Sequence, residues 1–301
     1  MSDNKIIVIG SSNTDMVVKS KKLPLPGETI LGGTFFMNAG GKGANQAVAA
    51  ARLGGSVILV AKVGNDIFGQ QSLERFKKEN INTDYVFIDN KNPSGTALIM
   101  VNEDGENCIV VAPGANSNLM PEDIAVINNL SGAGFILLQL EIPMETITEI
   151  VKTAKSNNQS IIINPAPAQK LDDELLEGLF LITPNETEVS MLTGINVNKQ
   201  LTASLAADFL LAKGVQNVII TMGKKGAYFK NKSQDFFIYA PDVKAIDTTG
   251  AGDTFNGAVA VALTEKKNWN EAVKFSVTAA SISVTRMGAQ SSVPYRNEIE
   301  F

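Results

Sequence analysis

Short apolar runs alternate with stretches of helical periodicity along most of the chain. Residues 6–9 (IIVI) are apolar at every position, which predicts a strand buried on both faces, and Gly10 then provides a sharp turn. The alanine-rich residues 43–53 predict a helix that Gly54 ends. The same alternation predicts further strands at 57–63, 134–140, 161–164, 180–182 and 218–221, and further helices at 68–79 (with Asp66 as N-cap), 143–155, 185–192 and 202–213.

An order in which strands and helices alternate predicts a parallel sheet with helices on both faces. We therefore expect an α/β fold, a Rossmann-like three-layer αβα arrangement with a mostly parallel central sheet. Ligands of such sheets bind beyond the carboxyl ends of the strands, so the loops that follow strands are the places to search for chemistry.

Two stretches, residues 29–38 and 96–114, are strand-like with no helix between their halves. The second contains an Asp-Gly pair that suits a tight hairpin turn, and its arms are apolar on both faces. We expect one domain over residues 1–301 with a small β-sheet lid formed by about residues 15–38 and 95–115. A small sheet with two apolar faces needs two covers. One cover would be a ligand cleft and the other a second copy of the chain; alternatively, the hairpin packs on its own domain.

Composition excludes several classes of function. The formal net charge is -5 and Lys and Arg do not cluster, which argues against a nucleic-acid surface. The chain has no histidine, which removes Ser-His and Cys-His nucleophile pairs and histidine metal sites. Its single cysteine, Cys108, forms no intrachain disulfide, so we expect a reducing, cytoplasmic setting. No stretch approaches the ~18–20 apolar residues of a membrane span, and the N-terminus does not resemble a signal peptide.

One glycine-rich loop, DTTGAGDTFNG at residues 247–257, precedes an apolar helical run. Gly250 and Gly252 permit close approach of a phosphate, and free N–H groups at a helix start bind anions. The spacing matches neither G-x-G-x-x-G nor a Walker loop. From these residues alone, Asp253 is either a helix cap or a catalytic base beside a phosphate site.

Three other features follow predicted strands or open predicted helices. The segment NAGGKGANQA at residues 38–47 suits a polyol held by amides and backbone groups, or is a tight strand-to-helix connection. In GSSNTD, Asn13 and Asp15 are natural partners of sugar hydroxyls, or form an Asx-turn. Glu141 ends a long buried strand and faces either a ligand or solvent.

The segment TPNETE at residues 183–188 predicts a capping box, with Thr183 as N-cap, Pro184 at the first helical position and Glu186 at the third. Asn185 and Glu188 are then free to face a nucleotide phosphate and its hydrated metal. Together with the glycine turn TMGKKG at 221–226, these loops place phosphate cradles, carboxylates and amides at one end of one sheet. Phosphoryl transfer to a polyol needs that combination.

Two motifs in order, GGKGANQA near the N-terminus and DTTGAGDTFNGA near the C-terminus, resemble the signatures of the PfkB-type, or ribokinase-like, carbohydrate kinases. The resemblance covers essentially the whole chain. It implies ATP-dependent phosphorylation of D-ribose at the 5-hydroxyl to give D-ribose 5-phosphate, with Mg²⁺ as a cofactor, activation by K⁺ and a homodimer formed through the lid. A related deoxyribokinase, fructokinase or adenosine kinase-like enzyme stays open, as does a non-catalytic sensor of sugars or nucleotides.

The resemblance also implies roles for individual residues. The pentose-binding set comprises Asn13, Asp15, Gly41, Lys42, Gly43, Asn45 and Glu141. Asp253 resembles the catalytic base, and Gly250, Ala251 and Gly252 with the Asp253 amide resemble the anion hole. Because a helix N-terminus favours the carboxylate form, we expect the pKa of Asp253 to be low.

The remaining implied roles concern the nucleotide and its cations. The nucleotide set comprises Asn185, Thr221, Gly223, Lys224, Gly226, Gly252 and Val277, the last in the adenine region. Glu188 resembles a residue that organises hydrated Mg²⁺. The monovalent-cation set comprises Asp247, Thr249, Ser283, Arg286, Gly288 and Ser292, several through backbone carbonyls.

Overall fold

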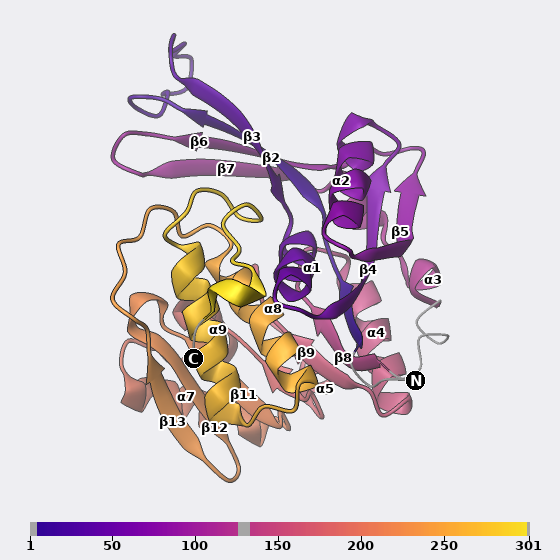
Figure 1. Cartoon of the computed structure of the whole chain (residues 1–301), viewed down its shortest axis with the longest axis vertical. Coiled ribbons are helices and arrows are strands. Elements are labelled where there is room, and N and C mark those ends of the chain that lie inside the picture. The colour runs from indigo at the N-terminus through magenta and orange to yellow at the C-terminus, as the bar shows by residue number, and fades with distance from the viewer. Residues whose placement is uncertain (1–4, 126–132, 300–301) are drawn as a thin grey trace.

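A computed structural model describes residues 5–125 and 133–299, and within these ranges the strands form a nine-stranded sheet and a four-stranded sheet (Figure 1). The large sheet has the order β13-β12-β11-β10-β9-β8-β1-β4-β5. Its strands are β1 (Lys5–Ile9), β4 (Ser56–Gly64), β5 (Asn82–Asp89), β8 (Ala133–Leu138), β9 (Ser160–Ile163), β10 (Leu181–Ile182), β11 (Asn217–Thr221), β12 (Gly226–Asn231) and β13 (Asp235–Tyr239).

The seven neighbouring strands β11-β10-β9-β8-β1-β4-β5 all pair in parallel, which confirms the predicted fold class. Strands β12 and β13 add an antiparallel hairpin at one edge. The pattern of the sequence did not predict this hairpin or β5, and the predicted strands and helices differ from the observed ones by one or two residues at their ends. Such offsets arise because helix and strand ends are set by local hydrogen bonds rather than by hydrophobic period.

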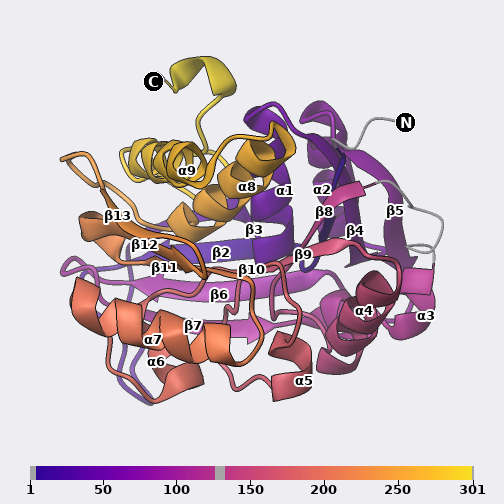
Figure 2. The same cartoon turned by 90° about the horizontal axis from the view of Figure 1, so that it is seen from below.

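Helices cover both faces of the large sheet, so the structure has three layers (Figure 2). One face carries α1 (Lys42–Arg52), α2 (Ile67–Lys78), α8 (Ala251–Thr264) and α9 (Trp269–Ser283). The other carries α3 (Pro121–Ile124), α4 (Met144–Ser156), α5 (Asp173–Leu176), α6 (Glu186–Thr193) and α7 (Gln200–Ala212). Asp66 is the N-cap of α2, as predicted, and its side chain accepts from the Gly69 N–H. No helix in the described ranges has the length and apolarity needed to cross a membrane.

The central strand β1 shows how the core is divided. Ile6 and Val8 pack into the hydrophobic cluster on the α1 and α8 side, whereas Ile7 and Ile9 pack into the cluster on the α4 and α7 side. All four side chains are fully buried. A strand with helices on both faces has no polar face, which is why residues 6–9 are uniformly apolar.

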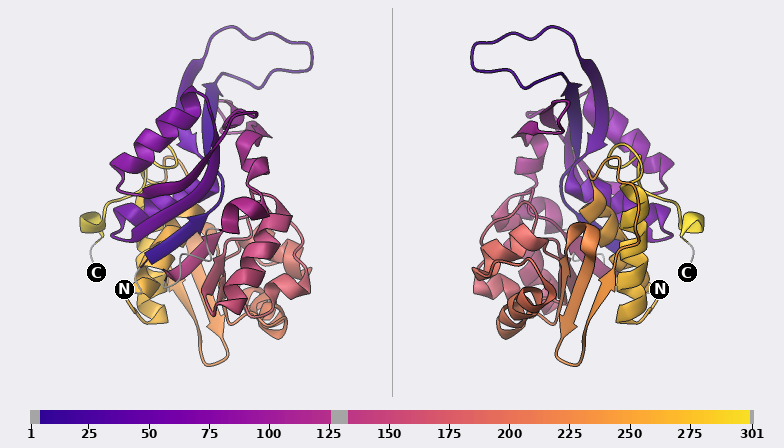
Figure 3. Two further views of the ribbon diagram at one scale, coloured as in Figure 1. Left: turned by 90° about the vertical axis from the view of Figure 1, so that its right-hand side faces the viewer. Right: turned by 90° about the vertical axis from the view of Figure 1, so that its left-hand side faces the viewer.

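The small sheet has the order β3-β2-β6-β7 and stands beside the large one (Figures 1 and 3). Its strands are β2 (Asn13–Lys19), β3 (Thr34–Gly40), β6 (Gly95–Val101) and β7 (Asn107–Ala112). The Asp-Gly hairpin between β6 and β7 is confirmed, with φ of 82° at Gly105. The expectation of a strand from residue 29 is wrong, because β3 begins at Thr34 after a long loop, and β2 supplies the central pairing instead.

The register of the small sheet separates its two faces. Residues directly opposite each other share a face, and alternate residues change face. Asp15 and Val17 therefore share one face of β2. The opposite face gathers exposed apolar side chains, a set that we call the outer apolar face: Val18, Phe35, Met37, Leu98, Met100 and Val110.

Helices α1 and α8 pack at very short range at Gly257. A Cβ atom on Gly257 would lie 2.6 Å from the Cβ of Ala49 and 2.7 Å from the backbone nitrogen of Ala50. The close approach brings the first turns of two helices, which the two glycine-rich motifs begin, to the same end of the large sheet.

We expect Gly257→Ala to lower the free energy of unfolding by roughly 1–3 kcal/mol, because overpacking a closely packed interface forces the helices apart. Chemical denaturation measures the change. Gly252→Ala, in the same helix, is the matched control: its added Cβ meets no atom within 4 Å, so its unfolding free energy should be unchanged or higher. Equal stability of the two variants would contradict close packing at Gly257.

Candidate active site

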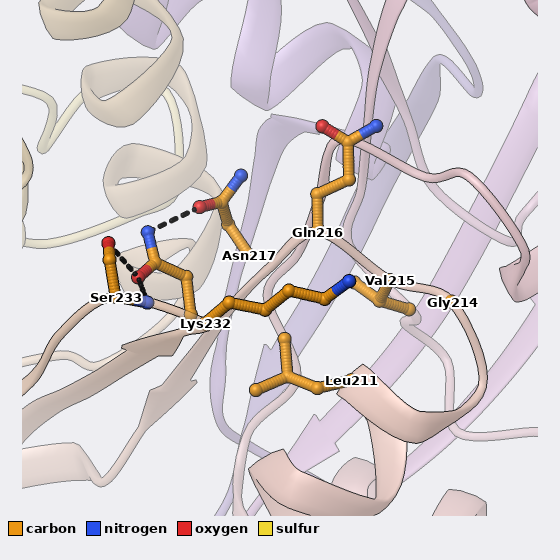
Figure 4. Close-up of a pocket in the computed structure, with 8 residues that line it drawn as sticks. Leu211, Gly214, Val215, Gln216, Asn217, Lys232 and Ser233 are labelled. Carbon is orange, nitrogen blue, oxygen red and sulfur yellow. Dashed lines mark hydrogen bonds between the residues drawn. The ribbon is translucent and has the colours of Figure 1, made fainter.

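Two cavities are candidates for the site. The smaller, about 330 Å³, lies beside the β11–β12 edge and is lined in part by Asn217, Lys232 and Ser233 (Figure 4). Its polar groups bond to one another: Asn231 Nδ2 donates to Asn217 Oδ1, and the Ser233 hydroxyl donates to Asn231 Oδ1. None of the predicted site residues lines this cavity.

The larger cavity, about 770 Å³, lies at the carboxyl ends of the strands of the large sheet. It holds all seven positions that the resemblance assigns to a nucleotide: Asn185, Thr221, Gly223, Lys224, Gly226, Gly252 and Val277. Lys42, Glu188 and Asp253 line the same cavity. The structure thus brings together the β11–β12 turn, the starts of α1, α6 and α8, and Val277 in the middle of α9. The strand-end argument predicts the loops but not the position in α9.

Asp253 does not cap α8. The N-cap of this helix is Gly250 in the left-handed conformation, with φ of 74°, and no side chain caps the first turn. Asp253 is the third helical residue, and its carboxylate turns to α1 instead. Asn45 Nδ2 donates to one carboxylate oxygen at 2.9 Å and Gln46 Nε2 donates to the other at 3.0 Å. The cap interpretation of Asp253 is therefore wrong.

Burial raises the pKa of Asp253, against the opposing effects of Lys42 and of the Asn45 and Gln46 amides. The expected low pKa at a helix N-terminus is thus outweighed by removal of the carboxylate from water. A higher pKa makes the ionised carboxylate a stronger acceptor for a proton than a surface aspartate would be.

Asp15, Glu141 and Asp253 lie close enough for their charges to interact, and Lys42 lies among them. Burial and the charges of Glu141 and Asp253 raise the pKa of Asp15 to about 6, while Lys42 acts in the opposite direction. The charge of Asp253 raises the pKa of Lys42 despite burial, so the ammonium group stays charged among the carboxylates. Carboxylates gathered in this way suit a ligand with many hydroxyl donors.

Glu141 holds the start of α1 in place. One of its oxygens accepts from the hydroxyl of Ser11 and from the backbone N–H of Lys42, the latter at 3.0 Å. Gly43 packs against the chain after β1, where a Cβ would lie 2.6 Å from the carbonyl carbon of Gly10. Glu141 therefore faces the protein rather than open solvent. The backbone contact explains why the GGKG segment has a glycine at position 43.

Asn13 is fixed by a residue that the sequence did not single out. Asn116 Nδ2 donates to Asn13 Oδ1 at 2.7 Å, and Asn116 Oδ1 accepts from the Ser12 N–H at 2.9 Å. Gln46 was missed in the same way. Both are buried polar residues, Gln46 within the GGKGANQA motif, and burial is not readable from a single polar letter in a sequence.

The capping box at α6 differs from the prediction. Asn185, not Thr183, is the N-cap: its Oδ1 accepts from the Glu188 N–H, and Glu188 Oε2 accepts from the Asn185 N–H, both at 2.9 Å. Thr183 instead lies directly after β10, and its hydroxyl donates to Asn256 Oδ1. Burial raises the pKa of Glu188, although the Asn185 N–H and Lys42 oppose this. Asn185 and Glu188 are therefore both capping partners and cavity residues.

Part of the predicted monovalent-cation set comes together around Asp247. Its Oδ1 accepts from the Thr249 N–H and hydroxyl, and its Oδ2 accepts from the Gly288 N–H at 2.8 Å. Other members contribute no side chain there. The Arg286 guanidinium pairs with Glu298, so only the backbone oxygen of Arg286 could be a ligand, and the hydroxyls of Ser283 and Ser292 donate to carbonyls of their own segments.

A family model described as pfkB family carbohydrate kinase matches residues 3–296. The chain belongs to this family. Among its relatives, a ribokinase of Bacillus subtilis is 44% identical over 296 residues, which cover 98% of each chain. A deoxyribokinase of Salmonella typhi is 40% identical over 291 residues, covering 96% of this chain and 95% of that protein.

Solved structures of the family have the same fold. The ribokinase of Arabidopsis thaliana, solved in complex with ribose and ATP, superposes with a TM-score of 0.91 at 34% identity and covers 99% of this chain and 97% of that one. The large mostly parallel sheet, the small sheet and the flanking helices are thus features of the family.

The raised pKa of Asp15 makes stability depend on pH in a defined direction. Between the ordinary value of 3.8 and about 6, the folded chain holds a proton on Asp15 that the unfolded chain lacks. The ionised carboxyl therefore costs stability above pH 6, on the order of 3 kcal/mol, and this cost disappears as the pH falls toward 4. We expect Asp15→Asn to be more stable than the wild type at pH 7–8, with the difference lost near pH 4, as measured by urea denaturation.

Asp66→Asn is the control with the opposite sign. Burial raises the pKa of Asp66, but the Ser94 and Gly69 N–H groups outweigh it, so the net pKa is lowered. Its ionised form stabilises the fold at neutral pH, and the variant should be less stable there. A loss of stability in Asp15→Asn of the same size at pH 8 and pH 4.5 would contradict the electrostatic explanation.

Proposed function

We propose that this protein phosphorylates D-ribose at its 5-hydroxyl with ATP, giving D-ribose 5-phosphate and ADP. The observation that carries the proposal is the convergence at one cavity of a carboxylate, Asp253, with a helix start that no side chain caps. Full-length similarity to ribokinases and to a ribokinase bound to ribose and ATP supports the choice of substrates.

In the proposed reaction, Asp253 takes the proton from the 5-hydroxyl as the oxygen attacks the γ-phosphorus of ATP. Phosphoryl transfer depends mainly on positioning and charge stabilisation, and the transition state is loose. The free N–H groups of the first turn of α8, at Gly252 and Asp253, would accept the developing charge on the phosphoryl oxygens, with Gly250 and Ala251 shaping the turn.

The sugar would lie over Lys42, between the small sheet and α1. Asp15 lies on the β2 face opposite the outer apolar face, and Gly40 leaves room for it, since a Cβ there would lie 2.2 Å from Asp15 Oδ1. We assign the sugar hydroxyls to Asp15, Asn13, Asn45 and the backbone of Gly41 to Gly43. Glu141 would act through the start of α1, which it already holds.

Mg²⁺ fits this site only as an ion held largely by phosphate and water. Within the described residues no group of three or more acidic side chains, histidines or cysteines gathers to hold a metal. The ion would neutralise charge on the ATP phosphates, and Glu188, whose carboxylate lines the cavity, would accept hydrogen bonds from its water shell.

We also propose that the protein is a homodimer in which the small sheet closes over the sugar. The outer apolar face supports this, because a contiguous set of large exposed apolar side chains on one face of a sheet is characteristic of a surface that is covered in the assembly. The side chains of β2 that we assign to the sugar lie on the opposite face of the small sheet, so the outer apolar face is free to contact a second copy.

We expect Asp253→Asn to retain ribose binding and to lose at least about 100-fold in kcat, because a general base contributes roughly 10²–10⁴-fold and the amide cannot take the proton. Coupled ADP release measures turnover, and calorimetry measures ribose binding. Asp172→Asn is the matched control, since Asp172 is exposed, makes no side-chain capping bond to α5 and does not line the cavity. Near wild-type turnover in Asp253→Asn would refute the base assignment.

The same assay, run with ribose, deoxyribose, fructose and adenosine in K⁺ and Mg²⁺, tests the choice of substrate. The highest kcat/KM should be found with ribose. The similarity to a deoxyribokinase makes deoxyribose the second candidate. A higher kcat/KM on any acceptor other than ribose would replace the proposed substrate while leaving the role of Asp253 in place.

We expect K⁺ to raise turnover, because the Asp247 loop, when ordered around a cation, adjoins the first turn of α8 through Thr249. Activity is compared at constant ionic strength in KCl, NaCl and choline chloride. Asp247→Asn should lose most of the K⁺ response. Equal rates in the three salts would remove the cation site from the proposal.

A further inference from the structure

The carboxylate of Asp253 lies at one end of a chain of buried side-chain amides whose members have no role in the proposed function. Gln46, the residue after Asn45 in α1, is fully buried, and its Nε2 donates to Asp253 Oδ1 at 3.0 Å. The same nitrogen donates to Asn164 Oδ1 at 3.1 Å, and Gln46 Oε1 accepts from Gln139 Nε2 at 2.6 Å. Both ends of the Gln46 amide therefore have partners.

The orientation of the Gln46 amide follows from two groups that only accept. The Asp253 carboxylate is one. The other is the Thr183 carbonyl, which accepts from Asn164 Nδ2 at 3.2 Å and so turns Asn164 Oδ1 toward Gln46. The nitrogen of Gln46 must face both oxygens, and its own oxygen is left for Gln139. Reversing the amide would break all three bonds.

The side chain of Gln139 lowers the free energy of unfolding, because one of its polar atoms is buried without a hydrogen bond. Its Oε1 is buried and has no hydrogen-bond partner, although its Nε2 bonds to Gln46. Gly10 makes room for this oxygen, since a Cβ there would lie 2.1 Å from it. An unpaired buried carbonyl is unfavourable for folding, and each such group in a native structure calls for an explanation. Orienting the amide of Gln46 is the explanation that the geometry offers.

The path from Gln46 also returns to α8. Asn164 donates to the backbone carbonyl of Thr183, and the hydroxyl of the same threonine donates to Asn256 Oδ1. Asn256 Nδ2 then donates to the carbonyl of Gly252 at 2.8 Å. The chain of hydrogen bonds thus begins at the carboxylate of Asp253 and ends on the peptide group directly before that residue. It fixes the side chain relative to the first turn of its own helix.

We propose that Gln46 is a positioning residue for Asp253, holding its carboxylate toward the acceptor hydroxyl and in fixed relation to the first turn of α8. This inference rests on the proposed function, in which Asp253 is the base. Asn45 holds the other carboxylate oxygen and is also assigned to the sugar, so its loss would be ambiguous. Gln46 does not line the large cavity and acts only through its neighbours.

The test is Gln46→Met, which keeps the length of the side chain and removes its hydrogen bonds. We expect kcat to fall about 10- to 100-fold, because small displacements of a catalytic group have effects of this size. The KM values for ribose and ATP should change less than about threefold. The acid limb of the kcat–pH profile should move to higher pH, because a donor that favours the ionised carboxylate is lost. A merely structural role would not move that limb.

Gln139→Met is the second variant, and it carries the test if Gln46→Met fails to fold. It leaves Gln46 in place and removes only the donor behind it, so the loss of kcat should be smaller and the acid limb should shift in the same direction. Gln159→Met is the matched control. The side-chain amide of Gln159 is buried, has no hydrogen-bond partner and does not line the cavity, so this variant should keep the wild-type kcat–pH profile.

Asp253→Asn, assayed in parallel, separates the two claims. If it keeps wild-type turnover, the base assignment and this inference fall together. If it loses turnover while folded Gln46→Met and Gln139→Met both keep the wild-type kcat and acid limb, the inference about Gln46 is overturned and the proposed function stands.

Discussion

The burial of the Asp253 carboxylate is the constraint on which the rest of the site depends. An ionised carboxylate is costly to remove from water unless donors and compensating charge surround it. Here two amides of α1 take its two oxygens, and Lys42 supplies a positive charge nearby. None of these groups neutralises it by direct ion pairing, so the carboxylate remains able to accept a proton. A tight salt bridge would have stabilised the charge and made the carboxylate a weaker proton acceptor in its proposed role.

Holding those donors in place requires two helices that approach unusually closely. Gly257 permits the contact between α8 and α1, and Gly43 permits α1 to begin against the turn after β1. Glu141 then fixes the first N–H of α1. The glycines of the two motifs thus have two structural roles. Gly250 adopts the left-handed conformation at the start of α8, whereas Gly43 and Gly257, which have no side chain, allow close backbone contacts. Stability and the geometry of the candidate site depend on the same close approach of α1 and α8.

The sequence alone was sufficient for six strands of the large sheet, because residues 6–9 and their counterparts are largely apolar runs, as a strand covered on both faces requires, but it did not reveal β5 or the β12–β13 hairpin. The family resemblance supplied the nucleotide positions, and the structure gathers them at one cavity. The sequence failed where the answer depends on partners distant in the chain. The N-cap of α6 was misplaced because Thr183 is engaged by Asn256, 73 residues away. The pKa of Asp253 had the wrong direction because burial is a property of the assembled layers, and Gln46 was overlooked for the same reason.

The alternation of β2 has a consequence for how the chain can change length. Asp15 and Val17 lie on the inner face of β2, whereas Val18 lies on the outer apolar face of the same strand. Deleting or inserting one residue between Gly10 and Asp15 would exchange the two surfaces along the whole strand, placing a carboxylate outside and apolar groups against the ligand. Length variation in this segment should therefore be tolerated only in steps of two, because one parity serves both the proposed sugar contacts and the proposed dimer surface.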